Sequence, residues 1–249
     1  MKTYKTSDIA HIIGVHPNTV RLYEKFGLIP KAERKENGYR VFDDFHLEQL
    51  RLARTAFEVE ILQNGLRKKA VDIIKLSAKR KFDKAICLAE NYLQQIRKEQ
   101  TDAVEAIAIV RELLTDCDDI AYKDNLCLTR KEAAEYLQVT IDTLRNWELN
   151  GLLTVRRMQN GYRIYTENDI KRLKIIRSLR CANFSLSAIL RMLSALYRNP
   201  EINIEMAIDT PQEDEDIVSA CDKLLTSLRK GEKNVKHILN QLKVFKNDF

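Results

Sequence analysis

Apolar residues recur at alternating spacings of four and three along two long stretches of the chain. The first series is Phe82, Ile86, Ala89, Leu93, Ile96, Gln100, Ala103, Ile107, Val110 and Leu114. The second series is Ile217, Cys221, Leu224, Leu228, Gly231, Val235, Ile238, Leu242 and Phe245. This spacing is typical of a coiled-coil seam and predicts long helices over residues 82–114 and 215–245. An amphipathic helix packed on its own domain is the alternative for either stretch alone, but two such seams favour pairing.

Shorter apolar periods precede the first long helix. Residues 6–13 predict a short helix with one apolar face. Gly14-Val15-His16 predicts a turn, and Pro17 suits the first position of a second helix, where its missing N–H costs nothing. Gly27 suits the left-handed end of that helix. Two short helices joined by a tight turn predict a helix-turn-helix, whose second helix usually enters the major groove of DNA.

A hairpin and a third helix follow. Asn37-Gly38 is a strong hairpin signal, and the β-prone residues 39–42 come directly after it. These residues predict a two-stranded wing. Asp43 is then placed to cap a third helix, so the first 80 residues predict a winged helix-turn-helix domain.

The same order of signals recurs 124 positions later. Identical pairs are Ala10 and Ala134, Val15 and Val139, Thr19 and Thr143, Arg21 and Arg145, Glu24 and Glu148, Gly27 and Gly151, and Leu28 and Leu152. After a deletion of one residue, Asn37-Gly38-Tyr39-Arg40 matches Asn160-Gly161-Tyr162-Arg163. The chain is therefore predicted to be mainly α, with two winged helix-turn-helix domains, each followed by a long coiled-coil-forming helix.

Capping signals sharpen the second copy. Residues 129–132 form a capping box, and Thr140 is placed to cap the second helix. Further helices are expected to start near Thr166 and at Phe184-Ser185-Leu186. The predicted segments are a first winged domain (1–80), a long helix (81–116), a linker (117–127), a second winged domain (128–198), and an acidic linker with a C-terminal coiled-coil helix (199–249).

The motifs of both copies resemble one known family. In its segments 19–24, 27–28 and 37–42, the first copy resembles the DNA-binding domain of the MerR family of bacterial transcription regulators. The second copy resembles it in the segments 143–148, 151–152 and 160–165. The resemblance implies a regulator without enzymatic activity that binds double-stranded promoter DNA, distorts overlong promoter spacers and works with RNA polymerase. It also implies an antiparallel dimerisation helix behind the first domain.

The two copies depart from the family pattern in a few places. The family usually has two adjacent aromatic residues before the Glu, and here Leu22 and Asn146 occupy the first of those places. Trp147 replaces the usual second Tyr, and the second copy lacks a counterpart of Pro30.

The residues expected to contact DNA lie in the second helix and the wing of each copy. In the first copy they are Asn18, Thr19, Arg21, Tyr23, Arg34, Tyr39 and Arg40. In the second they are Thr143, Arg145, Trp147, Arg156, Arg157, Tyr162 and Arg163, with Asp142 in the same part of its helix. Arginine suits guanine or phosphate contacts, and the aromatic residues offer ring surface and a polar tip.

Two questions about these residues remain open from sequence alone. Packing of Tyr39 and Tyr162 against the core is an equal alternative to DNA contact. Carboxylates repel phosphates, so Glu24 and Glu148 are expected to pair with Arg40 and Arg163 and to fix each helix to its wing.

Charge supports a polyanionic partner. Residues 1–80 carry 16 Lys and Arg against 10 Asp and Glu, and residues 126–200 carry 13 against 6. The segments behind them are acidic, with 6 against 10 in residues 81–125 and 7 against 10 in residues 201–249. A solvated surface explains most charge runs, but matched alternation in two copies favours nucleic acid.

The two long helices define the architecture. The short segment between residues 115 and 126 can bring the second domain to the far end of the first long helix. We therefore expect helix 82–114 to lie antiparallel to helix 215–245, so that one chain forms a pseudo-dimer. The alternative is a metal- or small-molecule-responsive regulator that acts as a homodimer of two-domain chains.

Other chemistries have weaker signals. Cys117 and Cys127 are candidate metal ligands behind the first long helix, although Cys127 also suits a buried structural role. An effector could bind among Phe184, Met192, Leu196 and Tyr197, or these residues could be ordinary core. No P-loop, zinc-protease motif or nucleophile elbow is present in the sequence, which argues against an enzyme, and no cofactor is expected.

The chain is also expected to be a cytoplasmic protein. Its N-terminus lacks the apolar run of a signal peptide, and no segment has the roughly 18 apolar residues of a membrane span. The five cysteines are scattered and odd in number, which suits a reducing compartment.

Overall fold

The computed structural model describes residues 2–57, 66–115, 127–159, 161–211 and 220–249. The chain forms two compact units. The first contains residues 1–98 together with residues 227–249, and the second contains residues 99–226. The last 23 residues therefore return to the unit that holds the N-terminus.

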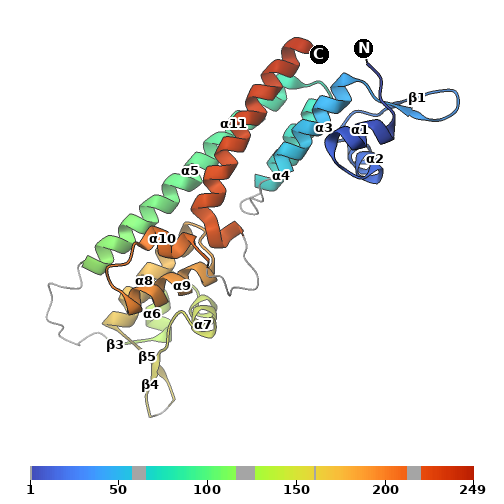
Figure 1. Ribbon diagram of the computed structural model, residues 1–249. Coiled ribbons are helices and arrows are strands. Elements are labelled where there is room, and N and C mark those ends of the chain that lie inside the picture. Colours follow the sequence, from blue (N-terminus) through green and yellow to red (C-terminus); the bar gives the residue numbers. More distant parts are fainter. Residues whose placement is uncertain (1, 58–65, 116–126, 160, 212–219) are drawn as a thin grey trace. The chain divides into compact units, whose positions relative to one another are not determined.

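The first unit opens with the predicted helix-turn-helix and wing. The elements are α1 (Thr6–Ile13), α2 (Pro17–Lys25), β1 (Glu33–Arg34), β2 (Arg40–Val41), α3 (Asp44–Phe57) and α4 (Leu66–Ala78) (Figure 1). Gly14 ends α1 at φ 72°, a left-handed conformation that favours glycine. Pro17 starts α2, and the backbone N–H of His46 donates to Asp43 Oδ1 (2.9 Å) at the start of α3. These predictions of turn and caps are confirmed.

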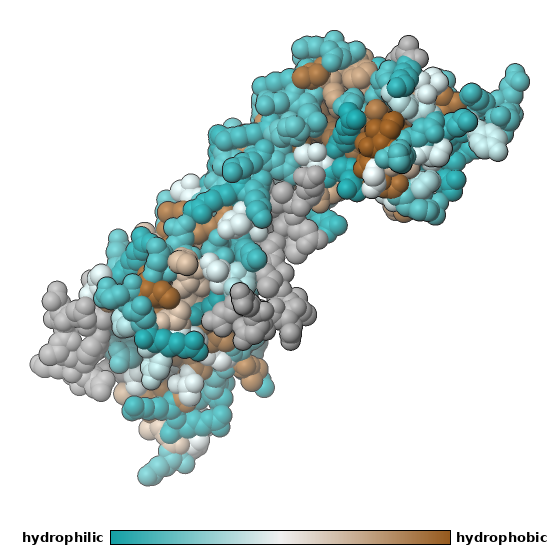
Figure 2. All heavy atoms as spheres, in the orientation of Figure 1, coloured by the Kyte–Doolittle hydropathy of each residue, from teal (hydrophilic) through white to brown (hydrophobic). Residues whose placement is uncertain are grey.

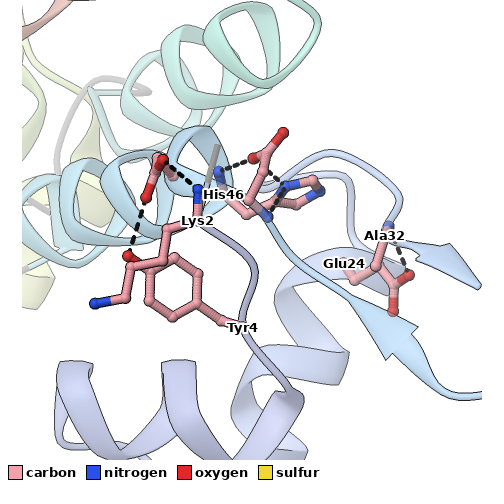
Figure 3. Close-up of polar contacts among 7 residues, drawn as sticks. Lys2, Tyr4, Glu24, Ala32 and His46 are labelled. Atoms are coloured by element: carbon pink, nitrogen blue, oxygen red, sulfur yellow. Dashed lines mark hydrogen bonds and ion pairs between the residues drawn. The ribbon is translucent and has the colours of Figure 1, made fainter.

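A small apolar core holds this domain together. Ile9 from α1, Val20 from α2, Ile29, Phe42 and Leu50 from α3 are all buried in it. Tyr4 bridges to Phe42 across the backbone, and its hydroxyl donates to Asp44 Oδ1 at 2.9 Å (Figure 3). The N-terminal segment is thus fixed to the start of α3.

A buried amide joins α3 to α4. Gln49 is fully buried, and its Nε2 donates to the carbonyls of Leu28 and Ile74, both at 3.0 Å. The hydroxyl of Ser77 donates to Gln49 Oε1 at 2.7 Å. Both the amide nitrogen and the amide oxygen of Gln49 therefore have hydrogen-bond partners, as is usual for a buried polar side chain.

Helices α5 (Phe82–Thr115) and α11 (Leu224–Asp248) both contribute to the first unit, where residues 82–98 of α5 lie antiparallel to residues 227–248 of α11 (Figure 1). Lys246 pairs with Asp83, and Arg97 Nε contacts Glu232 Oε1 at 3.1 Å. Asp83, near the start of α5, pairs with a residue near the end of α11, whereas Arg97, further along α5, pairs with a residue earlier in α11. The two helices therefore run in opposite directions. These exposed ion pairs add little free energy, and the apolar face between them carries the packing.

Four phenylalanine rings join the two long helices to α3. Phe245 of α11 lies 5.9 Å from Phe45 of α3 and 6.3 Å from Phe82 of α5, measured between ring centroids. Phe249 lies 4.9 Å from Phe45. The guanidinium of Arg80 stacks over the Phe45 ring at 4.6 Å and donates to the carbonyl of Phe249 at 2.9 Å. The C-terminal helix is therefore packed onto the first winged domain.

The predicted seams can be compared with burial. Every described seam residue of α11 is buried, namely Leu224, Leu228, Gly231, Val235, Ile238, Leu242 and Phe245. Ile217 and the side chain of Cys221 lie outside the described residues. In α5, Ile86 and Leu93 are only half-buried, and Ala85 and Tyr92 are buried beside them. From Phe82 to Ile96, the buried positions are therefore spaced by three and then four residues, in place of the predicted four and then three. Burial raises the pKa of Tyr92 to about 12.

The second unit repeats the winged domain and extends it. Its elements are β3 (Cys127–Thr129), α6 (Arg130–Tyr136), α7 (Ile141–Leu149), β4 (Arg156–Arg157), β5 (Arg163–Thr166), α8 (Glu167–Cys181), α9 (Leu186–Arg198), α10 (Ile204–Asp209) and the 3₁₀ turn Ala220–Lys223. Thr129 and Thr140 cap α6 and α7 as predicted, and Thr166 and Ser185 cap α8 and α9, which start where helices were expected. The reciprocal bond with Thr129 holds the pKa of Glu132 below its ordinary value.

The wing of the second domain is three-stranded, in the order β3-β5-β4, with both pairs antiparallel. Leu128 faces Tyr165 in this sheet, as Tyr4 faces Phe42 in the first domain. The sequence had placed Cys127 in a linker, so this third strand is a new feature.

Helix α10 lies in the segment predicted to be an acidic linker. Arg191 of α9 is buried and donates to the carbonyls of Ala207 (3.1 Å), Ile208 (2.8 Å) and Asp222 (2.9 Å). The Asp209 carboxylate accepts the backbone N–H of Leu225 at 2.8 Å. Because Asp209 caps the first turn of α11, α10 fixes where that helix starts.

The second half of α5 belongs to this unit. Asn183 lies just after α8, and its Nδ2 donates to Glu99 Oε2 of α5 at 3.0 Å. Among the described helices, none is long and apolar enough to cross a membrane.

Candidate nucleic-acid interface

The two second helices of the helix-turn-helix motifs are matched in length. Helices α2 and α7 each contain nine residues, and each is followed by a glycine with positive φ, Gly27 at 68° and Gly151 at 75°. Asn18 and Asp142 occupy the same place in the first turn of their helices, one residue before Thr19 and Thr143. The duplication seen in the sequence is therefore a duplication of geometry.

In the first domain, Glu24 joins the helix to the wing. Its Oε2 accepts from Arg40 Nε of β2 at 2.6 Å. Its Oε1 accepts from the backbone N–H of Ala32 at 3.2 Å (Figure 3). The Glu24 side chain is 12% exposed, so the pair is shielded from water. The predicted pairing of Glu24 with Arg40 is confirmed.

In the second domain, Glu148 has two arginine partners. Its Oε1 accepts from Arg163 Nε at 2.6 Å, as predicted, and its Oε2 accepts from Arg130 NH2 at 2.9 Å. Arg130 also donates to the Tyr165 hydroxyl at 3.5 Å. That hydrogen bond, opposed by burial and supported by Glu148, raises the pKa of Arg130. Arg130 replaces Thr6 of the first copy, so this second partner was not visible in the repeated motif.

The unequal partners of these two glutamates lead to a first prediction. Glu148→Gln is expected to lower the free energy of unfolding by about 1–3 kcal/mol, because two guanidinium groups lose their shared anion. Glu24→Gln is the matched control and should cost only about 1 kcal/mol, since an amide oxygen can still accept the Ala32 N–H. Urea denaturation followed by circular dichroism measures both. Equal costs would contradict the two-partner arrangement.

The wings present cations and tyrosines to solvent. Tyr39 and Tyr162 are both 71% exposed, so their packing against the core is excluded. Arg34, Arg156 and Arg157 are exposed on the strands, and Arg34 NH1 donates to the Gly38 carbonyl at 3.3 Å. Figure 2 shows mainly hydrophilic residues at the tip of the β1–β2 wing.

A basic cleft of about 900 Å³ separates α2 from the wing of the first domain. Its cationic lining residues are Arg21, Lys25, Lys31, Arg34 and Arg40, and Glu24 is its one acidic lining residue. Sequence reasoning missed Lys25 and Lys31, although Lys25 lies four positions after Arg21 and so shares its helix face.

The helices expected to read bases carry different contacts. Arg21 is exposed, and its NH1 donates to Asn18 Oδ1 at 3.0 Å. Arg145 and Asp142 are exposed, and neither has a hydrogen-bond or ion-pair partner within the described part of the chain. The Thr143 hydroxyl is engaged with Thr140 at 2.8 Å.

Two aromatic residues lie deeper than expected. Trp147 is only 4% exposed, because it shares the inward face of α7 with Leu144, three residues earlier. The expectation that its ring offers surface to DNA is therefore wrong. Tyr23 is half-buried and packs edge-on against Phe57 at 6.3 Å.

The candidate residues for metal binding and for an effector pocket do not form a site among the described residues. Cys127 is exposed, which excludes the buried role considered for it, and Cys117 lies outside the described residues. Among the described residues, no group of three or more His, Cys, Asp or Glu could hold a metal ion. Phe184 and Met192 are fully buried whereas Tyr197 is 91% exposed, so these three side chains do not line one cavity.

Both domains are winged helix-turn-helix modules, the class of fold that places its second helix in the major groove. Residues 5–42 match the family described as MerR family regulatory protein, and residues 128–196 match the family described as MerR HTH family regulatory protein. Each module is therefore similar in sequence to DNA-binding regions of MerR family regulatory proteins.

Curated relatives agree with the family matches. The HTH-type transcriptional regulator ZntR of Escherichia coli (strain K12) is 39% identical over 88 residues, which cover 35% of this chain and 57% of that protein. CueR of Escherichia coli O6:H1 is 43% identical over 53 residues, covering 21% and 39%. The mercuric resistance operon regulatory protein of Bacillus cereus is 32% identical over 65 residues, covering 26% and 49%.

The chain thus spans about half the length of these relatives. The matched families and relatives are transcription regulators, not enzymes. No solved structure matches the chain.

Proposed function

We propose that the chain is a sequence-specific regulator of transcription that binds double-stranded promoter DNA through both winged modules. The observation that carries the proposal is the duplicated arrangement in which a half-buried glutamate fixes a second helix to an arginine of the wing. That arrangement leaves Arg21 and Arg145 exposed on their helices and Tyr39 and Tyr162 exposed on their wings. Such a surface suits base contacts in the major groove flanked by phosphate contacts.

The proposed contacts follow the surface residues. Asn18, Thr19 and Arg21, with Thr143 and Arg145, meet base edges or nearby phosphates. Tyr23 contributes its polar tip, and the wings contribute Arg34, Tyr39, Arg40, Arg156, Arg157, Tyr162 and Arg163. Arg40 and Arg163 act chiefly as positioning residues, because each is already paired with a glutamate. Trp147 is left out.

We further propose that one chain supplies both halves of the DNA-binding assembly. The antiparallel contacts of α5 with α11, and the packing of Phe245 onto Phe45, support an intramolecular pseudo-dimer. Its two modules would bind one imperfectly symmetric operator in the cytoplasm, distort it and so alter how RNA polymerase engages the promoter. Readout through DNA deformability is physically reasonable because bending costs only a few kcal/mol.

Binding itself is tested with the full chain and a pool of random duplexes. Selection followed by gel shift should recover a preferred sequence, with affinity that falls steeply as salt rises. Footprints on the selected duplex should cover two adjacent half-sites. Absence of salt-sensitive binding to any duplex would overturn the proposed function.

The pseudo-dimer predicts the mass of the complex. Light scattering of the free chain should give 29.0 kDa, the mass of one chain. The complex with the selected duplex should contain one chain per DNA. Twice the chain mass, in either measurement, would favour the homodimer of two-domain chains.

A further inference from the structure

The two second helices present opposite hydrogen-bonding groups at equivalent positions. Asn18 of α2 and Asp142 of α7 both lie two residues after the cap of their helix, and both are exposed. An asparagine side chain offers donors and an acceptor, whereas an ionised aspartate offers acceptors only. The duplication therefore preserves the scaffold and changes the group at one place.

Contacts within the protein increase this difference. Asn18 Oδ1 already accepts from Arg21 NH1 at 3.0 Å, which leaves the Asn18 amide to present its NH₂ donors beside a guanidinium. In α7, within the described part of the chain, neither Asp142 nor Arg145 has such a partner. The first module thus presents donors, and the second presents a carboxylate next to an arginine.

Base edges in the major groove discriminate between these groups. Guanine offers N7 and O6 as acceptors, which suit the donors of the first module and repel a carboxylate. A carboxylate needs a donor, and only cytosine N4 and adenine N6 supply one in this groove. Adenine N7 is an acceptor beside N6, so cytosine is the better partner for Asp142.

We propose that Asp142 is a specificity-determining residue that selects cytosine in the half-site of the second module, so that the operator is asymmetric at this position. The proposal rests on the proposed function, since it assigns one base to an interface already inferred. It does not follow from the duplicated motif, which would give two identical half-sites.

Selection from a random duplex pool tests the proposal in the full chain. The wild type should recover cytosine at one position of one half-site and another base at the symmetry-related position. Asp142→Asn should reduce discrimination against other bases at that position by about 10- to 100-fold, the range that one good base contact supplies. Asn18→Asp should create a cytosine preference in the other half-site.

A charge-matched control separates base readout from general attraction to phosphate. Asp102→Asn removes one exposed carboxylate from α5. This residue lies outside α2, α7 and the two wings. The substitution should leave base preference unchanged. If Asp142→Asn strengthens binding to all duplexes by one common factor and keeps the cytosine preference, the proposal is overturned. It is equally overturned if the wild-type consensus is symmetric at this position. Failure of the wild type to bind any duplex would instead reject the proposed function.

Discussion

Replacing Arg21 and Arg145 together with alanine is expected to weaken binding to the selected duplex by about 2–6 kcal/mol. Each arginine is exposed on its helix, and loss of one base or phosphate contact of this kind costs about 1–3 kcal/mol. The two residues lie in separate compact units, so their effects should add. Gel-shift titration of the single and double variants measures the sum.

The salt dependence identifies which kind of contact is lost. If both arginines bind phosphates, the slope of log affinity against log salt should become shallower by about two. If they bind guanines, the slope should hold and base preference should relax. Arg54→Ala with Arg111→Ala is the matched control, since it also removes two exposed arginines, from α3 and α5. An unchanged affinity in the Arg21 and Arg145 double variant would remove both residues from the interface.

Phe245→Ala is expected to lower the free energy of unfolding by about 3–5 kcal/mol, the usual cost of truncating a buried phenylalanine. The ring is 3% exposed and lies within 6.3 Å of Phe45, Phe82 and Phe249, measured between centroids. Its loss leaves a cavity where α11, α5 and α3 meet. Urea denaturation followed by circular dichroism measures the change.

The neighbouring residue provides the control. Val244 is 53% exposed on the same helix, so Val244→Ala should change stability by no more than about 0.5 kcal/mol. Because Phe45 belongs to the first winged domain, Phe245→Ala should also weaken DNA binding by that domain. A loss below about 1 kcal/mol would mean that α11 does not pack on α3 in solution.

Sequence reasoning succeeded where a local rule or the repeat applied. Capping residues such as Thr129 and Thr140 act within one turn of backbone, so neighbouring residues suffice to predict them. The pairing of Glu24 with Arg40 was predictable because the duplication kept both members and a carboxylate disfavours the DNA surface. These signals are independent of the rest of the fold.

Features that depend on distant packing were missed. The buried Arg191 bonds to carbonyls from α10 and the following turn, and a lone arginine in a helix gives no periodic signal for such a role. Trp147 was assigned to the surface by analogy with Tyr23, although its spacing from Leu144 indicated the inward face. The packing of the long helices on the winged domains depends on contacts between residues more than 100 positions apart in sequence. The heptad spacing alone does not show which helices pair.

The return of residues 227–249 to the first compact unit affects synthesis as well as structure. The second unit, residues 99–226, is continuous in sequence and is synthesised before residues 227–249, which complete the first unit. The first unit therefore lacks Phe245 and Phe249 until α11 and the residue after it have been synthesised, although its winged domain is made first. A chain truncated before α11 would leave the apolar face of α3 and α5 uncovered.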